Sequence, residues 1–268
     1  MSEADAVARV DQPITIDRLV ENLRALGISG GETVLCHSSM SAIGWVCGGP
    51  PAVVDALMEA IGADGTIVMP THTTQYSDPA AWQHPPVPES WYPIIMEERP
   101  PYRPDITPSR GMGAIVECFR TYPDVVRSRH PLYSFAAWGA DANAIIEDHP
   151  LEFPLGPESP IGAIYDRDGT VLMLGTGYST NTSLHLGEHL ADLDKGFETE
   201  TAPILESGEK RLESFQVLST STADFETVGQ AFDAEHAIDT ATVGDATSRL
   251  IEQRSLVDFA ASWFGVNR

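Results

Sequence analysis

Helical and strand-like patterns alternate twice early in the chain, and this alternation limits the folds that the chain can adopt. Apolar residues recur at helical spacing over 16–26, and a second helical pattern opens at Pro50. Each helix is followed by a short apolar run, at 33–37 and at 65–69, with the length of a buried strand. Two helix–strand pairs in succession are typical of an α/β layer structure.

The remaining chain continues this pattern without a linker that would divide it. Thr15 is a suitable N-cap for the first helix, and Gly27 is a suitable stop. Later elements are expected as strands at 134–138, 169–174 and 212–218 and as helices at 111–119, 161–165, 225–232 and 256–264. We therefore expect one domain over 1–268, in which residues 1–13 form a flexible N-terminus. The segment 75–108 holds nine of the 20 prolines, and a loop of that length is usually functional, often as a lid or a binding wall.

The chain is strongly acidic, because 39 Asp and Glu against 16 Lys and Arg give a formal net charge of −23 in 268 residues. This charge repels phosphate, which excludes a general nucleic-acid binder and argues against docking on an anionic membrane. We interpret most of the excess as a solvated surface, with attraction of polycations to an active site as the alternative. The lack of a long apolar run, the acidic N-terminal stretch and the three cysteines favour a cytoplasmic protein.

Two loops that follow expected strands carry groups suited to a ligand site. Residues 37–44 and the glycines at 48–49 have small side chains, which let backbone N–H groups approach an anion closely. Their pattern is neither a triphosphate-binding loop nor a dinucleotide fingerprint. Residues 175–182 lead from a buried strand into a helix, and active sites of open α/β sheets gather beyond the carboxyl ends of strands.

His185 and Glu188 fall one turn apart at the start of that helix, so they share a face. A carboxylate beside a histidine fixes its tautomer and raises its basicity, which makes His185 a suitable general base; the alternative is one exposed histidine on a capped helix. His185 and His189 have the spacing of a metal pair, but the HExxH order is absent, and we expect no metal. Arg110, in a glycine-rich stretch, suits a phosphate clamp, with a surface salt bridge as the alternative.

Five motifs in a fixed order carry a resemblance to a known family. They are HSSMSAIGWVCGG (37–49), MPTHT (69–73), TPSRGMGAIVECFR (107–120), RSRHPLYSFAAWG (127–139) and ESPIGAIYDRDGTVLMLGTGYSTNTSLHLGEH (158–189). This succession resembles the aminoglycoside 3-N-acetyltransferases. The resemblance implies a single-domain α/β/α sandwich with a central mixed sheet flanked by helices. It also implies an acyltransferase that uses acetyl-coenzyme A and an amine acceptor, typically the 3-amino group of the 2-deoxystreptamine ring of an aminoglycoside.

The resemblance also implies roles for individual residues. His185 matches the family's catalytic histidine, Glu188 its acidic neighbour and His37 the histidine before the serine pair. Thr73 falls where the family approaches the thioester, and Asp78 falls where acids on the acceptor side are expected. The residues implied for coenzyme A are Ser38, Ser39, Met40, Ile43 and Gly44 at the pantetheine and pyrophosphate, and Ser109 and Arg110 at the phosphates.

In the expected mechanism, His185 takes a proton from the acceptor ammonium and the amine attacks the thioester directly. His37, Thr73 or a loop N–H would stabilise the tetrahedral oxyanion. An acyl-enzyme on Cys36 is disfavoured, because a thiol within a strand is more often buried and inert. Three alternatives remain: another small amine as acceptor, a coenzyme A-binding protein without transfer activity, and a hydrolase using the same histidine. The expected partners are a small polycationic amine and neither nucleic acid nor membrane, with the chain a monomer or a homodimer.

Overall fold

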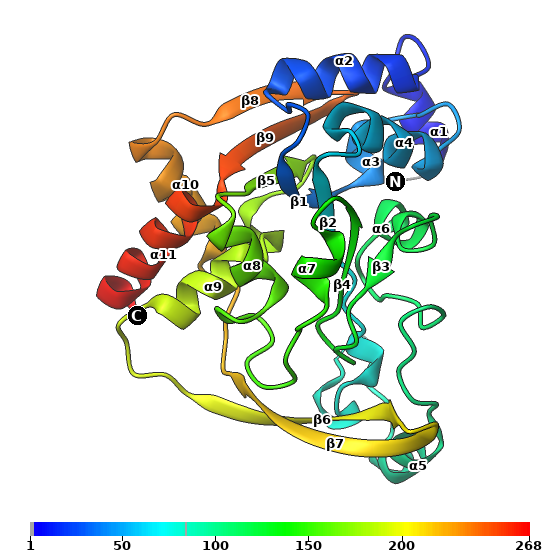
Figure 1. The fold of residues 1–268 in the computed structure, drawn as a ribbon, viewed down its shortest axis with the longest axis vertical. Helices are drawn as coiled ribbons and strands as arrows, with labels where there is room; N and C mark the ends of the chain where they lie inside the picture. The colour runs from blue at the N-terminus through cyan, green and yellow to red at the C-terminus, as the bar shows by residue number, and fades with distance from the viewer. Residues whose placement is uncertain (1–2, 84) are drawn as a thin grey trace.

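A seven-stranded mixed sheet forms the centre of the computed structural model, which describes residues 3–83 and 85–268 (Figure 1). The strand order is β3-β4-β2-β1-β5-β9-β8. The strands are β1 (Thr33–Ser38), β2 (Thr66–Pro70), β3 (Val126–Arg127), β4 (Phe135–Gly139), β5 (Thr170–Leu174), β8 (Asp239–Val243) and β9 (Ala246–Glu252). The three central strands β2, β1 and β5 run parallel, while β4 and β9 pair antiparallel to them. The carboxyl ends of three neighbouring strands therefore meet at one edge of the sheet.

Helices cover both faces of this sheet. Strand residues alternate between two apolar clusters, so that Val34 and Cys36 of β1 pack in one and Leu35 packs in the other. The first cluster includes α2 (Ile16–Leu26), α4 (Pro50–Ile61) and α6 (Ala114–Phe119). The second includes α7 (Ala142–Ile146), α8 (Pro160–Asp166), α9 (Ser183–Leu190), α10 (Phe225–Glu235) and α11 (Gln253–Asn267). The predicted α/β/α sandwich with a mixed central sheet is confirmed.

The first helix has the predicted boundaries. Thr15 accepts the N–H of Arg18 through its hydroxyl at 3.3 Å, which caps the start of α2. Gly27 ends α2 with a φ of 119°, a conformation that glycine adopts without strain. The pattern did not reveal β8 and β9, which complete the sheet beside β5, nor the full length of the hairpin described next.

A long β-hairpin extends away from the central sheet and forms a second, two-stranded sheet (Figure 1). It consists of β6 (Phe197–Glu206) and β7 (Glu209–Leu218), and its base is closed by the Ser219 N–H on the carbonyl of Gly196 at 2.9 Å. Near its tip, the Lys210 ammonium donates to the carbonyls of Met96 and Glu97 in α5 (Tyr92–Glu98). The proline-rich segment also contains three short 3-10 turns, η1 (Thr74–Tyr76), η2 (Pro79–Ala81) and η3 (Glu89–Trp91).

The N-terminal segment begins with a short helix, α1 (Glu3–Ala8). Nε of Arg9 donates to Oδ2 of Asp245 at 2.9 Å, which links this segment to the turn between β8 and β9. The flexibility expected for residues 1–13 stays a prediction. In the structure, residues 3–8 of this segment form α1, and Arg9 contacts Asp245. Among the described residues, no helix is both long enough and apolar enough to cross a membrane.

Candidate active site

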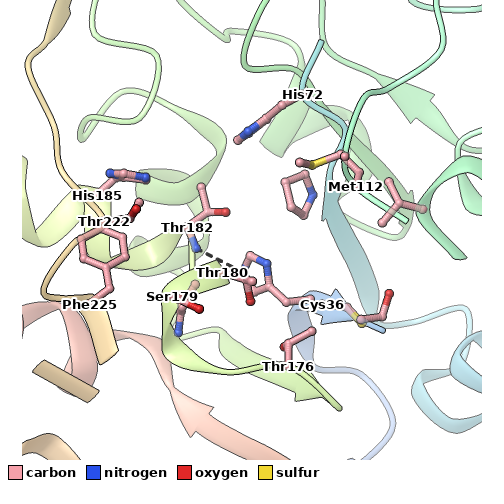
Figure 2. A pocket seen from close by; sticks show the side chains of 16 residues that line it. Cys36, His72, Met112, Thr176, Ser179, Thr180, Thr182, His185, Thr222 and Phe225 are labelled. Carbon is pink, nitrogen blue, oxygen red and sulfur yellow. Dashed lines mark hydrogen bonds between the residues drawn. The ribbon is translucent and has the colours of Figure 1, made fainter. Parts of the chain in front are cut away.

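The carboxyl ends of the three central strands open into a cavity of about 340 Å³ (Figure 2). Strand β1 contributes His37 and Ser38 to its wall, and His72 follows the end of β2. The loop after β5 contributes Thr176 and residues 179–182, and this loop contains the 3-10 turn η4 (Tyr178–Thr180). Helix α9 adds His185, and α10 adds Phe225. Segments far apart in the sequence thus meet where the strands end, as expected for an active site of an open α/β sheet.

His185 lies in the first turn of α9 and is paired with Glu188, as the spacing predicted. The Nδ1 atom of His185 lies 2.6 Å from Oε2 of Glu188. The ring of Phe225 packs against His185 with 4.9 Å between ring centroids, which fixes the imidazole from the other side. Burial alone would raise the pKa of Glu188, but hydrogen bonds from His185, Arg268 and the Ser221 N–H hold this pKa below its ordinary value. Glu188 is therefore ionised and accepts the Nδ1 proton, which leaves Nε2 of His185 as the basic nitrogen.

His37 and His72 are two neutral imidazoles in the wall of the cavity. Burial lowers the pKa of His37 to about 4 and, reinforced by nearby histidines and Arg127, lowers the pKa of His72 to about 3. The N–H of Thr182 donates to Nε2 of His37 at 3.3 Å, the dashed line in Figure 2. Nε2 of His72 is buried and has no hydrogen-bond partner within the described part of the chain. Both rings can therefore offer an N–H without adding a charge at neutral pH.

A groove of about 550 Å³ continues from this cavity and shares Ser38, Gly111, Met112, Thr176 and Thr180 with it. Of the residues predicted to bind coenzyme A, Ser38, Ser39 and Met40 line this groove. The hydroxyls of Ser38 and Thr176 are buried and lack a hydrogen-bond partner among residues 3–83 and 85–268. Unsatisfied buried hydroxyls are costly, so their presence fits a groove that binds a ligand rich in polar groups.

Two other residues predicted for coenzyme A lie outside the groove. Ile43 is fully buried in the apolar cluster beneath α2 and α4. Gly44 has a φ of 99° and lines a separate small cavity with Trp45 and residues of α1. Neither residue is among the described residues that line the groove.

Ser109 and Arg110 are not among the described residues that line the catalytic cavity or the groove, although the next residue, Gly111, lines both. The N–H of Arg110 donates to the carbonyl of His72 at 2.9 Å, which ties the two segments together. The Arg110 guanidinium carbon lies 5.8 Å from the ring centroid of Trp82, and both residues line a separate cavity of about 390 Å³. The Ser109 N–H donates to Glu117 Oε1 at 2.7 Å, while its hydroxyl has no partner in the part of the chain that the structure describes.

The structure does not bring Thr73 and Asp78 to the catalytic cavity. Thr73 is completely buried, and its hydroxyl donates to the carbonyl of Pro131. Asp78 is exposed and accepts the Ala80 N–H at 2.9 Å, so it caps η2. Neither is among the described residues that line the cavity.

Sequence reasoning missed several residues of the site. His72 stands within the quoted MPTHT motif, and its place directly after a strand was an available signal. Phe225 begins α10 and Thr222 precedes that helix, about 40 positions after His185, and no local pattern marked either as a site residue. Arg268 contacts Glu188 across 80 positions of sequence, a pairing that only the folded chain reveals.

Comparisons with known proteins agree with this architecture. The family model described as aminoglycoside 3-N-acetyltransferase matches residues 35–265. The SPbeta prophage-derived aminoglycoside N(3')-acetyltransferase-like protein YokD of Bacillus subtilis is 47% identical over 94% of this chain and 93% of its own length. The crystal structure of YokD matches with a TM-score of 0.96 at 45% identity, covering 98% of each chain.

Two further solved structures are complexes with ligands. "AAC-IIIb binary with CoASH" matches with a TM-score of 0.85 at 27% identity, covering 94% of this chain and 97% of that one. "AAC-VIa bound to Sisomicin" matches with a TM-score of 0.85 at 30% identity, covering 94% and 98%. The family match, the YokD sequence and the shared fold confirm the resemblance that the five motifs carry, and this chain belongs to the aminoglycoside 3-N-acetyltransferase family.

Proposed function

We propose that this acyltransferase moves the acetyl group of acetyl-coenzyme A to the 3-amino group of the 2-deoxystreptamine ring of an aminoglycoside. The observation that carries the proposal is the His185–Glu188 pair, held at 2.6 Å in a cavity that continues into a groove with unsatisfied hydroxyls. The neighbours solved with CoASH and with sisomicin support a donor of the coenzyme A type and an aminoglycoside acceptor.

The groove provides the binding site for the donor. Its wall between Ser38 and Met40 and its opposite wall at Gly111–Ala114 would hold the pantetheine arm, with the thioester reaching the catalytic cavity. Gly175 has a φ of 70°, and a Cβ there would lie 2.6 Å from the Cβ of Ala42, so glycine keeps the loop close to the groove. Arg110 directly precedes Gly111 of the groove wall and lines a separate cavity, and its charge suits the phosphates of coenzyme A.

His185 supplies the proton transfer. Its Nε2 takes a proton from the acceptor ammonium, and the freed amine attacks the thioester carbonyl carbon. The resulting oxyanion needs an N–H donor, and His37 with its neutral neighbour His72 lines the cavity for this purpose. When the C–S bond breaks, the imidazolium of His185 gives its proton to the leaving thiolate, and the second proton leaves the acetylated nitrogen for solvent. The products are the amide, coenzyme A as the thiol and one proton.

The state of the Cys36 thiol is consistent with direct transfer of the acetyl group to the amine. Its side chain is fully buried, and burial raises the pKa of its thiol to about 12. A thiol with that pKa carries almost no thiolate at neutral pH, and the thiolate is the nucleophilic form. We therefore assign no acyl-enzyme to Cys36.

The acceptor is a polycation, and the formal net charge of −23 favours its approach. Asp78 is exposed and follows Ser77, which lines the cavity of Arg110 and Trp82, so its carboxylate is available to a ligand ammonium there. We also expect a cytoplasmic protein, which acts as a monomer or a homodimer.

The test is a thiol-release assay with acetyl-coenzyme A and a panel of aminoglycosides, checked by mass spectrometry of the product. Acetylation of the 3-amino group supports the proposal. Turnover only with linear polyamines, which lack the 2-deoxystreptamine ring, would assign another amine as acceptor. Thiol release without any acceptor would indicate a hydrolase, and tight cofactor binding without turnover would indicate a binding protein.

A further inference from the structure

Glu188 accepts hydrogen bonds on both of its oxygens. Its side chain is almost fully buried, with a relative exposure of 2% for the residue. While Oε2 meets His185, Oε1 accepts the Ser221 N–H at 2.9 Å and a hydrogen bond from the Arg268 guanidinium. The carboxylate that orients His185 therefore shares its charge between an imidazole and a guanidinium.

Arg268 is itself fixed in place. Its Nε and one terminal nitrogen contact the two oxygens of Asp224 at 2.8 and 2.5 Å, and it also donates to the carbonyl of Ser221 at 2.8 Å. The guanidinium carbon lies 4.0 Å from the ring centroid of Phe264, one turn earlier. A row of alternating charges thus runs from Asp224 through Arg268 and Glu188 to His185 and joins the start of α10, the end of α11 and α9.

We propose that Arg268 and Asp224 are positioning residues that set how strongly Glu188 stabilises the protonated form of His185, and so the pH range in which His185 acts as a base. The inference rests on the proposed function of His185. The positive charge of Arg268 weakens the field of Glu188 at the imidazole. The negative charge of Asp224 in turn weakens the field of Arg268. Removing each charge must therefore move the protonation of His185 in opposite directions.

Other titratable groups also face His185 and are the same in every variant. They are Glu188 and His189 on α9, His37 on β1 and His72 after β2. Burial keeps His37, His72 and His189 neutral near pH 7, since it lowers their pKa values to about 4, 3 and 4. Differences between variants then report the Asp224–Arg268 pair.

The experiment compares Arg268→Met, Arg268→Lys and Asp224→Asn with the wild type. Arg254→Met is the matched control, because Arg254 lies on the same helix but pairs with Asp168 and the Tyr165 carbonyl on an exposed surface. The first readout is the acidic limb of the pH–kcat/KM profile with acetyl-coenzyme A and an aminoglycoside. The second is the NMR titration of the His185 ring in labelled protein without substrates, assigned by comparison with His185→Ala.

In Arg268→Met, both titrations should move to higher pH by about 0.5–1 unit, because an unneutralised Glu188 favours the imidazolium. Arg268→Lys keeps a charge and should restore most of the wild-type value. Asp224→Asn should move both titrations to lower pH by about 0.3–0.5 unit. Arg254→Met should leave them unchanged.

Shifts in the same direction for Arg268→Met and Asp224→Asn, or no shift in either, would overturn the inference. If Arg268→Met fails to fold in thermal unfolding, the downward shift of Asp224→Asn alone decides. If the wild type acetylates no aminoglycoside but the two variants show NMR shifts in opposite directions, the proposed function is wrong and the role of Arg268 and Asp224 is supported. If the wild type acetylates aminoglycosides but the variants show no NMR shift, the proposed function is supported and the role of Arg268 and Asp224 is wrong.

Discussion

The backbone N–H of Thr182 donates to Nε2 of His37 at 3.3 Å and joins the end of β1 to the residue that precedes α9. Since Nε2 is the acceptor, the ring proton of neutral His37 resides on Nδ1. One bond therefore fixes the tautomer of a cavity residue and anchors the helix that carries His185. It also places a neutral histidine where protonation would break the contact.

Stability should accordingly fall in acid. Burial lowers the pKa of His37 to about 4, against an ordinary value near 6.5, so the unfolded chain binds this proton more readily. Its contribution is complete above pH 6.5 and is lost as pH falls toward 4. The free energy of unfolding, measured with urea, should fall between pH 7 and pH 5. This fall should be about 2 kcal/mol smaller in His37→Asn than in the wild type. Equal differences in the two proteins would contradict the neutral, buried state of His37.

His185→Ala should lower turnover by roughly 10²–10⁴-fold, which is typical for the loss of a general base. The affinity for coenzyme A, measured by calorimetry, should stay close to that of the wild type because the groove is untouched. A variant that binds coenzyme A and retains full turnover would refute the assigned role.

Arg110→Ala should raise the KM for acetyl-coenzyme A by about tenfold, the usual loss for a hydrogen bond to a charged group. The effect should shrink as ionic strength rises, because salt screens an exposed charge. Repeating the assay with a donor that lacks the 3′-phosphate locates the contact. If Arg110→Ala raises the KM for this donor by the same factor, Arg110 contacts the pyrophosphate. If the KM for this donor does not change, Arg110 contacts the 3′-phosphate. An unchanged KM for both donors would remove Arg110 from the donor site.

Thr73→Val tests whether Thr73 stabilises the oxyanion, a role that the sequence predicted and that the geometry does not favour. The Thr73 hydroxyl already donates to the Pro131 carbonyl in a fully buried position, so its loss should reduce the free energy of unfolding by about 1–3 kcal/mol. We expect turnover to change only a few-fold. A fall of roughly 10²–10³-fold in a folded variant, as for a lost oxyanion donor, would return Thr73 to the reaction.

Gly229→Ala should destabilise the wall behind the cavity. A Cβ at Gly229 would lie 2.0 Å from the ring of Tyr178, whose hydroxyl donates to Asp233 at 2.5 Å. Since the ring must move, we expect a loss of about 1–3 kcal/mol in the free energy of unfolding. Gly196→Ala is the control, because its Cβ would meet Ser219 at an ordinary 3.4 Å. Equal melting temperatures for the two variants would contradict the packing.

The order of elements could be predicted where local signals are strong. Helix α2 begins behind Thr15 and ends before Gly27 as expected, because its cap, apolar face and stop all lie within one short segment. Strands β8 and β9 could not be predicted, since only pairing with β5 and with each other makes their polar, partly exposed sequences extended. The same holds for β6, which bonds to β7 in the described chain.

Some residues of the candidate site could likewise be predicted from local patterns, and others could not. The pairing of His185 and Glu188 follows from helical spacing, and Ser38–Met40 follow from a loop after a strand. Spacing along the chain does not tell which loop residues face the groove, so Ile43 and Gly44 point to the core or to another cavity. Arg268 enters the site through the packing of α11 against α9 and α10, which no segment of sequence encodes by itself.

The β6–β7 hairpin has a consequence for how such enzymes can diverge. Its two strands bond to each other and leave the register of the seven-stranded sheet untouched, at least across the residues that the structure describes. Insertions or deletions near its tip can therefore remodel the outer surface around α5 while the strand ends that hold His37, His72 and His185 keep their spacing. A change of substrate range in this architecture does not require the chemistry to be rebuilt.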